Sequence, residues 1–279
     1  MIKRFLFTFL TALFASLLIV TAWDSLGLKA FINTKVLHIK EAQTANVDAD
    51  LTEDNLKDRL KNLLLENPEF IFVDTLNVFQ QQEEEKRQNE IQQAILENKE
   101  ILYNSTDPIM GNPEGDVTII EFLDYNCGYC KRVAPSLFSL LEKDGELKII
   151  IKEFPILSQS SILAAQAALA AHKQGKYDTF HRALIGFRGT LNNEAILAQA
   201  KASGLDMEQL AKDMDSEEIA QQLDDTIALA QALGVNGTPA FIIGDQLYPG
   251  ALSKGQIEQL IEEVRLERLR LNPPPEIEG

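Results

Sequence analysis

The stretch that decides the fold is residues 117–133, VTIIEFLDYNCGYCKRV. Its first seven residues are a largely apolar run that predicts a strand, and a helix-like segment follows the second cysteine. Cys127 and Cys130 are the only two cysteines in the chain. A C-x-x-C pair between a strand and a helix is typical of a redox site, because free N–H groups and the helix dipole favour a thiolate on the first sulfur. The thiolate is the form that attacks disulfides, so the pattern predicts thiol–disulfide chemistry.

Other interpretations of the two cysteines need residues that the chain does not place beside them. A structural zinc site needs about four ligands, and the other candidates are three scattered histidines, His38, His172 and His181. Covalent haem attachment needs a histidine after the second cysteine, where the chain has Lys131. A structural disulfide across two residues would close too short a loop to constrain an unfolded chain much. A Cu(I) site held by the two thiolates and an inert pair stay open as alternatives.

The composition is that of an ordinary globular protein with a strong acidic bias. The 279 residues are 45% hydrophobic and carry a formal net charge of −16, from 42 acidic and 26 basic residues. Such a charge argues against nucleic acid and anionic membrane surfaces as partners. The length suits one large domain with an accessory segment. We expect no cofactor and no dedicated metal site.

The N-terminus has the pattern of an export signal. Lys3 and Arg4 precede an uncharged segment, residues 5–23, whose length lies between that of a signal peptide and that of a single membrane-spanning helix. Residues 1–23 are therefore predicted to be a signal peptide or a signal anchor, and residues 24–50 a linker. In either case the rest of the chain is expected to be exported, to a compartment where disulfide chemistry is possible.

Residues 51–103 are predicted to form a helical N-terminal segment. Apolar residues dominate its first part, residues 80–90 contain none, and an apolar stripe then resumes. The apolar part of so long a helix needs a partner surface, so we expect an oligomerisation segment near 51–79 and a helical spacer near 80–103. The alternative is an ordinary helical subdomain that folds onto the same chain.

The rest of the chain predicts an α/β domain over residues 104–271, followed by a disordered tail at 272–279. Proline and glycine residues indicate that the domain opens with a loop, residues 104–116. The order after this loop is strand, helix, strand, several helices, hairpin and helix, predicted at residues 117–123, 130–143, 148–153, 160–234, 241–248 and 253–271. This order predicts a thioredoxin-like fold with an inserted helical domain, preceded by the α-helical N-terminal segment.

Three segments of this domain strongly resemble the DsbA family of exported bacterial thiol–disulfide oxidoreductases. They are Glu121–Lys131 (EFLDYNCGYCK), Lys152–Pro155 (KEFP) and Gly234–Phe241 (GVNGTPAF). The resemblance implies a periplasmic location, cysteine-containing exported proteins as substrates, and a membrane redox partner that reduces or oxidises the cysteine pair. The N-terminal extension is similar to that of trimeric ScsC-type and isomerase-like members, and dimeric relatives with such extensions also exist. A homo-oligomer, a trimer or a dimer, is therefore expected. If residues 5–23 are not cleaved, they would tether the protein to the inner membrane.

The resemblance also implies a role for each predicted site residue. Cys127 would form the mixed disulfide with a substrate, and Cys130 would resolve it. Thr238 and Pro239 match the family's cis-proline loop, which lies against the two sulfurs. Glu121 matches the family's buried acid, and burial would raise its pKa, which suits proton exchange with Cys130.

Four nearby polar residues have less support as site residues. Lys152 is expected either to pair with Glu121 or to be solvated, and Glu153 could equally be solvated. His172 and His181 lie in the predicted helical insert, far in sequence from the thiols, and are expected to be satisfied structural histidines.

Two departures from the strongly oxidising DsbA proteins favour an isomerase or reductase. Gly128 and Tyr129 replace the Pro-His pair of those proteins, and Thr238 before the cis-proline is also found in isomerase-type relatives. We therefore expect a protein disulfide isomerase or reductase. The alternatives are a dithiol oxidase that donates disulfides, a Cu(I)-binding copper-tolerance protein, and a structural protein with incidental thiols.

Overall fold

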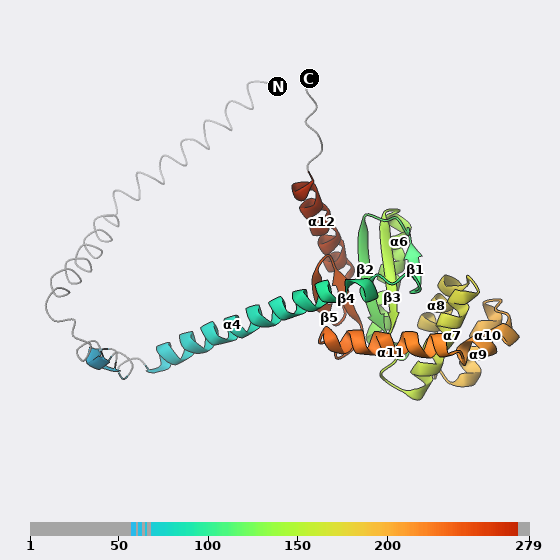
Figure 1. Ribbon diagram of the computed structural model, residues 1–279, viewed down its shortest axis with the longest axis horizontal. Helices are drawn as coiled ribbons and strands as arrows, with labels where there is room; N and C mark the ends of the chain where they lie inside the picture. The colour runs from blue at the N-terminus through green and yellow to red at the C-terminus, as the bar shows by residue number, and fades with distance from the viewer. Residues whose placement is uncertain (1–56, 60, 63–64, 66–67, 273–279) are drawn as a thin grey trace, which may run out of the picture. The chain divides into compact units, whose positions relative to one another are not determined.

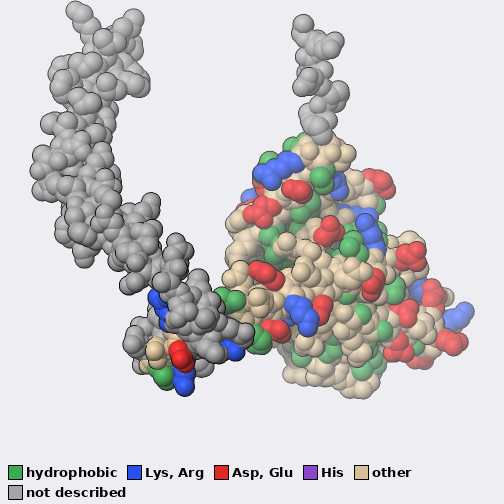
Figure 2. Space-filling model, turned by 60° about the vertical axis from the view of Figure 1, so that its left-hand side comes forward, with side chains coloured by type: hydrophobic (Ala, Val, Ile, Leu, Met, Phe, Trp, Pro, Cys, Tyr) green, Lys and Arg blue, Asp and Glu red, His purple; other side chains and the backbone are tan. Residues whose placement is uncertain are grey.

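The computed structural model describes residues 57–59, 61–62, 65 and 68–272, and the chain divides into two units, Met1–Gln80 and Gln81–Gly279. The predictions for residues 1–23, 24–50 and most of the 272–279 tail fall outside the described residues. None of the helices in the described ranges is long and apolar enough to cross a membrane. Over the face in view in Figure 2, acidic side chains are interspersed with lysines and arginines.

The second unit is built on a mixed sheet with the strand order β1-β3-β2-β4-β5 (Figure 1). β2 and β3 are parallel, and every other neighbouring pair is antiparallel. The strands predicted on either side of the first helix and the predicted C-terminal hairpin are confirmed. The strands are β1 (Ile109–Gly111), β2 (Val117–Leu123), β3 (Leu147–Glu153), β4 (Ala240–Ile243) and β5 (Gln246–Pro249).

The central strand β2 sends alternate side chains into two separate cores, as the two-residue period of a strand requires. Ile119 and Leu123 belong to a large core on one face of the sheet. Ile120 and Phe122 belong to a smaller core on the other face. Glu121 lies between Ile119 and Leu123 in this alternation, so the strand directs its carboxyl group into the large core.

Seven helices follow β2 in the described part of the chain, and five of them form an insertion between β3 and β4. In Figure 1, α7 to α10 gather beside the sheet and α11 runs back towards it. The inserted helical domain predicted from the sequence is thereby confirmed. The helices are α6 (Gly128–Lys143), α7 (Gln159–Lys173), α8 (Tyr177–Gly186), α9 (Asn193–Ala202), α10 (Met207–Met214), α11 (Glu217–Ala232) and α12 (Lys254–Leu271).

Side-chain caps explain where most of these helices begin. A polar residue just before the helix accepts a hydrogen bond from a backbone N–H of the first turn, which would otherwise be unpaired. The capping residues are Ser158 for α7, Asn192 for α9, Asp206 for α10, Ser216 for α11 and Ser253 for α12.

The second face of the sheet is covered in part by the end of the long N-terminal helix. Helix α4 (Pro68–Glu97) stops before Asn98, whose side-chain amide donates to the Ala94 carbonyl oxygen at 2.9 Å, and α5 (Lys99–Leu102) follows. Ile95 and Leu102 are buried in the smaller core. The end of the predicted spacer therefore packs on the sheet, while the polar stretch at 80–90 is exposed.

One part of the predicted loop at 104–116 proved to be a strand. Strand β1 pairs antiparallel with β3, with Ile109 opposite Ile150 and Gly111 opposite Lys148. The strand has only three residues, follows Pro108 and ends at Gly111, so its sequence is too short to show a two-residue alternation. It forms because the outer edge of β3 offers free backbone partners, which is a property of the tertiary structure.

Candidate redox site

The first cysteine caps helix α6. Cys127 has an extended backbone and its Sγ accepts a hydrogen bond from the Cys130 N–H at 3.4 Å. Both thiols are free, and both residues are buried. Strand β2 ends at Leu123, and four residues later the chain turns into the helix, so the first sulfur lies at the helix N-terminus as the sequence predicted.

The loop before β4 brings a second element to the same sulfur. The Thr238–Pro239 peptide bond is cis. The Cys127 thiol donates to the Thr238 carbonyl oxygen at 3.1 Å, across a sequence separation of 111 residues. Within the described part of the chain, the buried Thr238 hydroxyl has no hydrogen-bond partner. The predicted cis-proline loop is therefore present and lies against Cys127.

The two thiols differ strongly in acidity. The Cys130 side chain, the Thr238 side chain and the backbone N–H groups of Cys130 and Tyr129 lower the pKa of Cys127 from 9.0 to about 5, against the opposing effect of burial. The pKa of Cys130 is raised, first by its hydrogen bond to Cys127, then by burial and by Glu121. At neutral pH the arrangement therefore holds one thiolate and one thiol.

Glu121 is buried on the core side of β2, as its apolar neighbours predicted. Burial, followed by the neighbouring Glu153 and Cys127, raises the pKa of Glu121 to about 8. The residue lines a cavity of about 10 Å³ together with Leu123, His181 and Ile185. Such a volume is close to the minimum for one water molecule. A carboxyl group with this pKa can give or take a proton near neutral pH.

The expectation that Lys152 pairs with Glu121 or is solvated is wrong. The Lys152 side chain is buried, and its ammonium group bonds to the Asp107 carboxylate and the Ile101 carbonyl oxygen. Lys152 is one residue beyond Ile151, the strand partner of Glu121, so it points to the opposite face of the sheet. The alternation along β3, and not proximity in sequence, decides its partner.

A second buried carboxyl group, Glu153, was missed by the sequence reasoning. Its Oε1 accepts hydrogen bonds from the Tyr177 hydroxyl at 2.6 Å and the Tyr125 hydroxyl at 2.9 Å. Burial raises the pKa of Glu153 to about 8. The signal that could have found it is its position at the end of the apolar strand β3, two residues after Ile151, the strand partner of Glu121.

The two histidines of the insert both pack against the ring of Tyr177. His181 is buried, and its Nδ1 lies 3.0 Å from the Tyr125 hydroxyl. Burial lowers the pKa of His181 to about 3, so the ring is neutral. The ring of His172 packs edge-on against Tyr177, with 6.0 Å between centroids. The described residues contain no group of three or more metal-ligating side chains.

Comparison with known proteins agrees with this geometry. The thioredoxin family model matches residues 103–263. A thioredoxin-like oxidoreductase from Silicibacter pomeroyi DSS-3 is 44% identical over 61% of this chain and 98% of its own, with a TM-score of 0.59. The thiol–disulfide exchange protein alpha-DsbA2 from Wolbachia pipientis is 32% identical over 63% of this chain and 96% of its own, with a TM-score of 0.60.

Two further matches differ in how much of each chain they cover. A linker-deletion mutant of Proteus mirabilis ScsC is 26% identical over 80% of this chain and 99% of its own, with a TM-score of 0.61. The chain is also 26% identical, over 57% of its length, to a Na⁺/H⁺ antiporter, NhaA, from Herminiimonas arsenicoxydans, but it spans only 26% of that protein. This chain belongs to the thioredoxin family, and within it to the DsbA- and ScsC-type thiol–disulfide oxidoreductases.

Proposed function

We propose that the protein is an exported thiol–disulfide oxidoreductase that acts on cysteine-containing proteins, as an isomerase or a reductase. The observation that carries the proposal is the Cys127 sulfur at the start of α6, 3.1 Å from the Thr238 carbonyl oxygen, with a pKa lowered to about 5. A thiolate at neutral pH, beside a backbone segment that can pair with an extended peptide, suits attack on a substrate disulfide.

The proposed cycle begins when the Cys127 thiolate attacks one sulfur of a substrate disulfide. A mixed disulfide forms, and the other substrate sulfur leaves as a thiolate. In isomerisation, a substrate thiolate then attacks the substrate sulfur of the mixed disulfide, which forms a new substrate disulfide and restores the Cys127 thiolate with no net oxidation. In reduction, Cys130 loses its proton and attacks Cys127; the substrate leaves as a dithiol and Cys127–Cys130 remains oxidised.

Glu121 is proposed to exchange the proton with Cys130 in the reducing branch and its reverse. The Cys130 thiol must lose a proton to attack, and its sulfur must regain one when the Cys127–Cys130 disulfide is opened. The pKa of Glu121, raised to about 8 by burial, lies close enough to neutral pH for both directions.

The surface beside the thiols supports an unfolded protein as the substrate. Tyr129, between the two cysteines, is 59% exposed, and Leu157 is 53% exposed. The Leu157 N–H donates to Asp124 at 2.9 Å, which fixes this leucine next to the loop that carries Cys127. Apolar side chains exposed here suit the apolar segments that misfolded chains display.

The choice of isomerase over oxidase rests on three features of the chain. Gly128 and Tyr129 stand where strongly oxidising relatives have Pro-His, and threonine precedes the cis-proline. Helix α4 exposes Val73, Leu76 and Phe79, which suits assembly into an oligomer with several redox sites. Several sites around one substrate help an isomerase to retain a misfolded chain.

A dithiol oxidase is the second candidate, because one observation favours it. A lowered thiol pKa stabilises the reduced form and makes the disulfide more oxidising, and the value of about 5 for Cys127 is well below that of an ordinary thiol. Under either function, we propose that the protein works in the periplasm and that a membrane partner resets the oxidation state of the cysteine pair.

The proposed function is tested by reactivation of a scrambled-disulfide protein with residues 46–279, beside the same chain with Cys127→Ser. An isomerase restores activity and the variant does not. The reduction potential separates the candidates: a value near that of protein disulfide isomerase, about −180 mV, fits the proposal, and one near about −120 mV fits the oxidase. Fast oxidation of a reduced protein without reactivation of the scrambled one would overturn the isomerase assignment.

A further inference from the structure

Three successive residues of the loop that carries Cys127, residues 124–126, are hydrogen-bonded to the helical insert or to the segment that leads into it. The Asp124 carboxylate accepts from the Ser161 hydroxyl at 2.7 Å and from the Leu157 N–H at 2.9 Å. The Asn126 side-chain amide lies 3.0–3.1 Å from three serine hydroxyls, those of Ser158, Ser160 and Ser161. These two residues therefore bind the loop to the start of α7.

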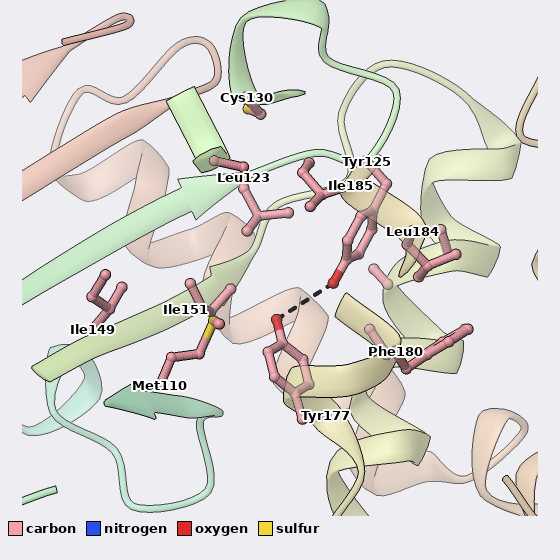
Figure 3. Close-up of a cluster of buried hydrophobic side chains, with 14 of the residues drawn as sticks. Met110, Leu123, Tyr125, Cys130, Ile149, Ile151, Tyr177, Phe180, Leu184 and Ile185 are labelled. Atoms are coloured by element: carbon pink, nitrogen blue, oxygen red, sulfur yellow. Dashed lines mark hydrogen bonds between the residues drawn. The ribbon is translucent and has the colours of Figure 1, made fainter. Parts of the chain in front are cut away.

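The residue between them, Tyr125, binds the loop to a different part of the insert. Its hydroxyl donates to Glu153 and lies 3.4 Å from the Tyr177 hydroxyl and 3.0 Å from His181 Nδ1. Figure 3 shows the hydroxyls of Tyr125 and Tyr177 facing each other, with Tyr125 near the end of β2. Tyr125, Glu153, Tyr177 and His181 are all buried.

Glu153 is the point at which the tyrosine hydroxyls converge. Its Oε1 accepts a hydrogen bond from each of the two hydroxyls. The other carboxyl oxygen, Oε2, is buried and has no hydrogen-bond partner among the described residues. Glu153 pairs with Leu123 in the register of β2 and β3, so it shares one face of the sheet with Glu121. The other charged groups that act on it are Asp124 and Asp107.

The position of the Cys127 sulfur is tied to that of the loop. The Cys127 N–H donates to the Asp124 carbonyl oxygen at 3.0 Å, so the cysteine follows the loop. The Thr238 carbonyl oxygen that faces the sulfur belongs to a different loop, before β4. A shift of the 124–127 loop would therefore move the Cys127 sulfur relative to Thr238, whose side chain helps to lower the Cys127 pKa, without a change in either residue.

We propose that Glu153 is a positioning residue of the redox site: acting through Tyr125, it holds the 124–127 loop on the helical insert and so sets how strongly Cys127 is held as a thiolate. The insert then has a part in the chemistry and does more than cover the sheet. The inference deepens the proposed thiol–disulfide function and rests on it for its meaning in catalysis.

The experiment compares two variants. Tyr125→Phe removes the hydrogen bond between Tyr125 and Glu153, whereas Glu153→Gln keeps an acceptor oxygen for both tyrosines but cannot ionise. The control is Tyr248→Phe, because the Tyr248 hydroxyl donates to Gln246, which lies on β5 and away from the thiols. In each folded variant, the Cys127 pKa is measured from thiolate absorbance, and the equilibrium constant with glutathione is measured at neutral pH.

We expect Tyr125→Phe to raise the Cys127 pKa and to shift the glutathione equilibrium towards the protein disulfide by about five- to tenfold, the size of one hydrogen bond. Glu153→Gln and Tyr248→Phe should stay near the wild-type value. A Tyr125→Phe protein that is less stable to urea but has an unchanged Cys127 pKa would reduce the network to a structural role and overturn the proposal.

If Tyr125→Phe does not fold, Tyr177→Phe takes its place, because it leaves Glu153 with a single tyrosine donor. We expect a shift in the same direction, and an unchanged pKa in folded Tyr177→Phe would overturn the proposal. The titration needs no substrate. A wild-type protein that exchanges no disulfide with glutathione would therefore count against the proposed function, while the Cys127 pKa values would still decide the role of the hydrogen bonds between Glu153 and the two tyrosines.

Discussion

The acidity of Cys127 depends on contacts that single side chains and single peptide groups make with one sulfur atom. The Cys130 side chain contributes the largest lowering of the Cys127 pKa, ahead of Thr238 and the backbone N–H groups. The same contact raises the pKa of Cys130. One contact across two intervening residues therefore favours a thiolate at Cys127 and a protonated thiol at Cys130.

Removal of the second thiol tests this division directly. We expect Cys130→Ala to raise the pKa of Cys127 from about 5 towards 9.0, because the leading hydrogen bond to the thiolate is lost. Thiolate absorbance as a function of pH gives the value. The matched variant, Cys127→Ala, should show no thiolate near neutral pH, because the Cys130 pKa is raised. A Cys127 pKa that stays near 5 would show that the backbone groups dominate.

The two buried carboxyl groups predict how stability depends on pH. Burial raises the pKa of Glu121 and of Glu153 from 4.5 to about 8, so the folded protein binds more protons than the unfolded chain between these values. The contribution of these groups to the free energy of unfolding is therefore full below pH 4.5 and falls as the pH rises to about 8. Urea unfolding at several pH values measures it.

The double variant Glu121→Gln with Glu153→Gln provides the comparison for this prediction. Neither amide ionises, so the variant should lose the decline in stability that the wild type shows over the same pH range. A variant whose stability declines with pH as steeply as that of the wild type would show that other groups cause the pH dependence.

At the scale of the elements, a buried ion pair connects strand β3 with helices α5 and α11 on the second face of the sheet. Lys152 on β3 bonds to Asp107, which follows α5, and the Asp107 Oδ1 accepts from the side-chain amide of Gln222 on α11 at 3.0 Å. Both charged side chains are almost fully buried. The pair holds the end of the N-terminal helices and the last helix of the insert on the same strand.

Breaking this pair should be costly. We expect Asp107→Ala to lower the free energy of unfolding by about 3–5 kcal/mol, because it leaves the Lys152 ammonium buried without its partner. The double variant with Lys152→Met should recover much of the loss. The control is Glu218→Ala, which breaks the Lys173–Glu218 pair at an exposed glutamate and should cost about 1 kcal/mol or less. The free energies of unfolding are obtained from urea unfolding. Equal losses for Asp107→Ala and Glu218→Ala would contradict the prediction that the buried ion pair matters more to stability.

At the scale of the whole molecule, the exposed apolar residues of α4 predict self-association. Leu76 and Phe79 are three residues apart, hence on one side of the helix, and they are 39% and 59% exposed in the single chain. We expect Leu76→Asp with Phe79→Asp to reduce the mass measured by light scattering to that of one chain, and to abolish reactivation of scrambled disulfides.

The control for the association prediction is Gln80→Asp with Gln82→Asp, which adds the same charges to the exposed polar stretch of the same helix. Its mass and its isomerase activity should stay at wild-type values. A wild-type protein that already has the mass of one chain would contradict the prediction, and an oxidase that works as a monomer would then be favoured.

Much of the fold follows from the sequence because its determinants are local. Alternating or continuous apolar runs mark β2 and β3, capping residues mark helix starts, and Cys127-Gly128-Tyr129-Cys130 marks the turn from strand to helix. The inserted helical domain and the burial of Glu121 were predicted on the same grounds. The roles of the site residues remain proposals, although the structure brings Thr238 and Pro239 to the sulfur, as the family resemblance implied.

The tertiary structure alone decided the partners of side chains that are far apart in the chain. Strand β1 exists because β3 has a free edge, and Lys152 binds Asp107 because strand alternation turns it away from Glu121. The convergence of Tyr125 and Tyr177 on Glu153 joins residues 24 and 28 positions apart, with no periodic signal between them. Local patterns depend on neighbouring residues, so a sequence reports them directly. Partners of buried polar groups depend on which faces the packed elements turn towards each other, and only the assembled core determines that.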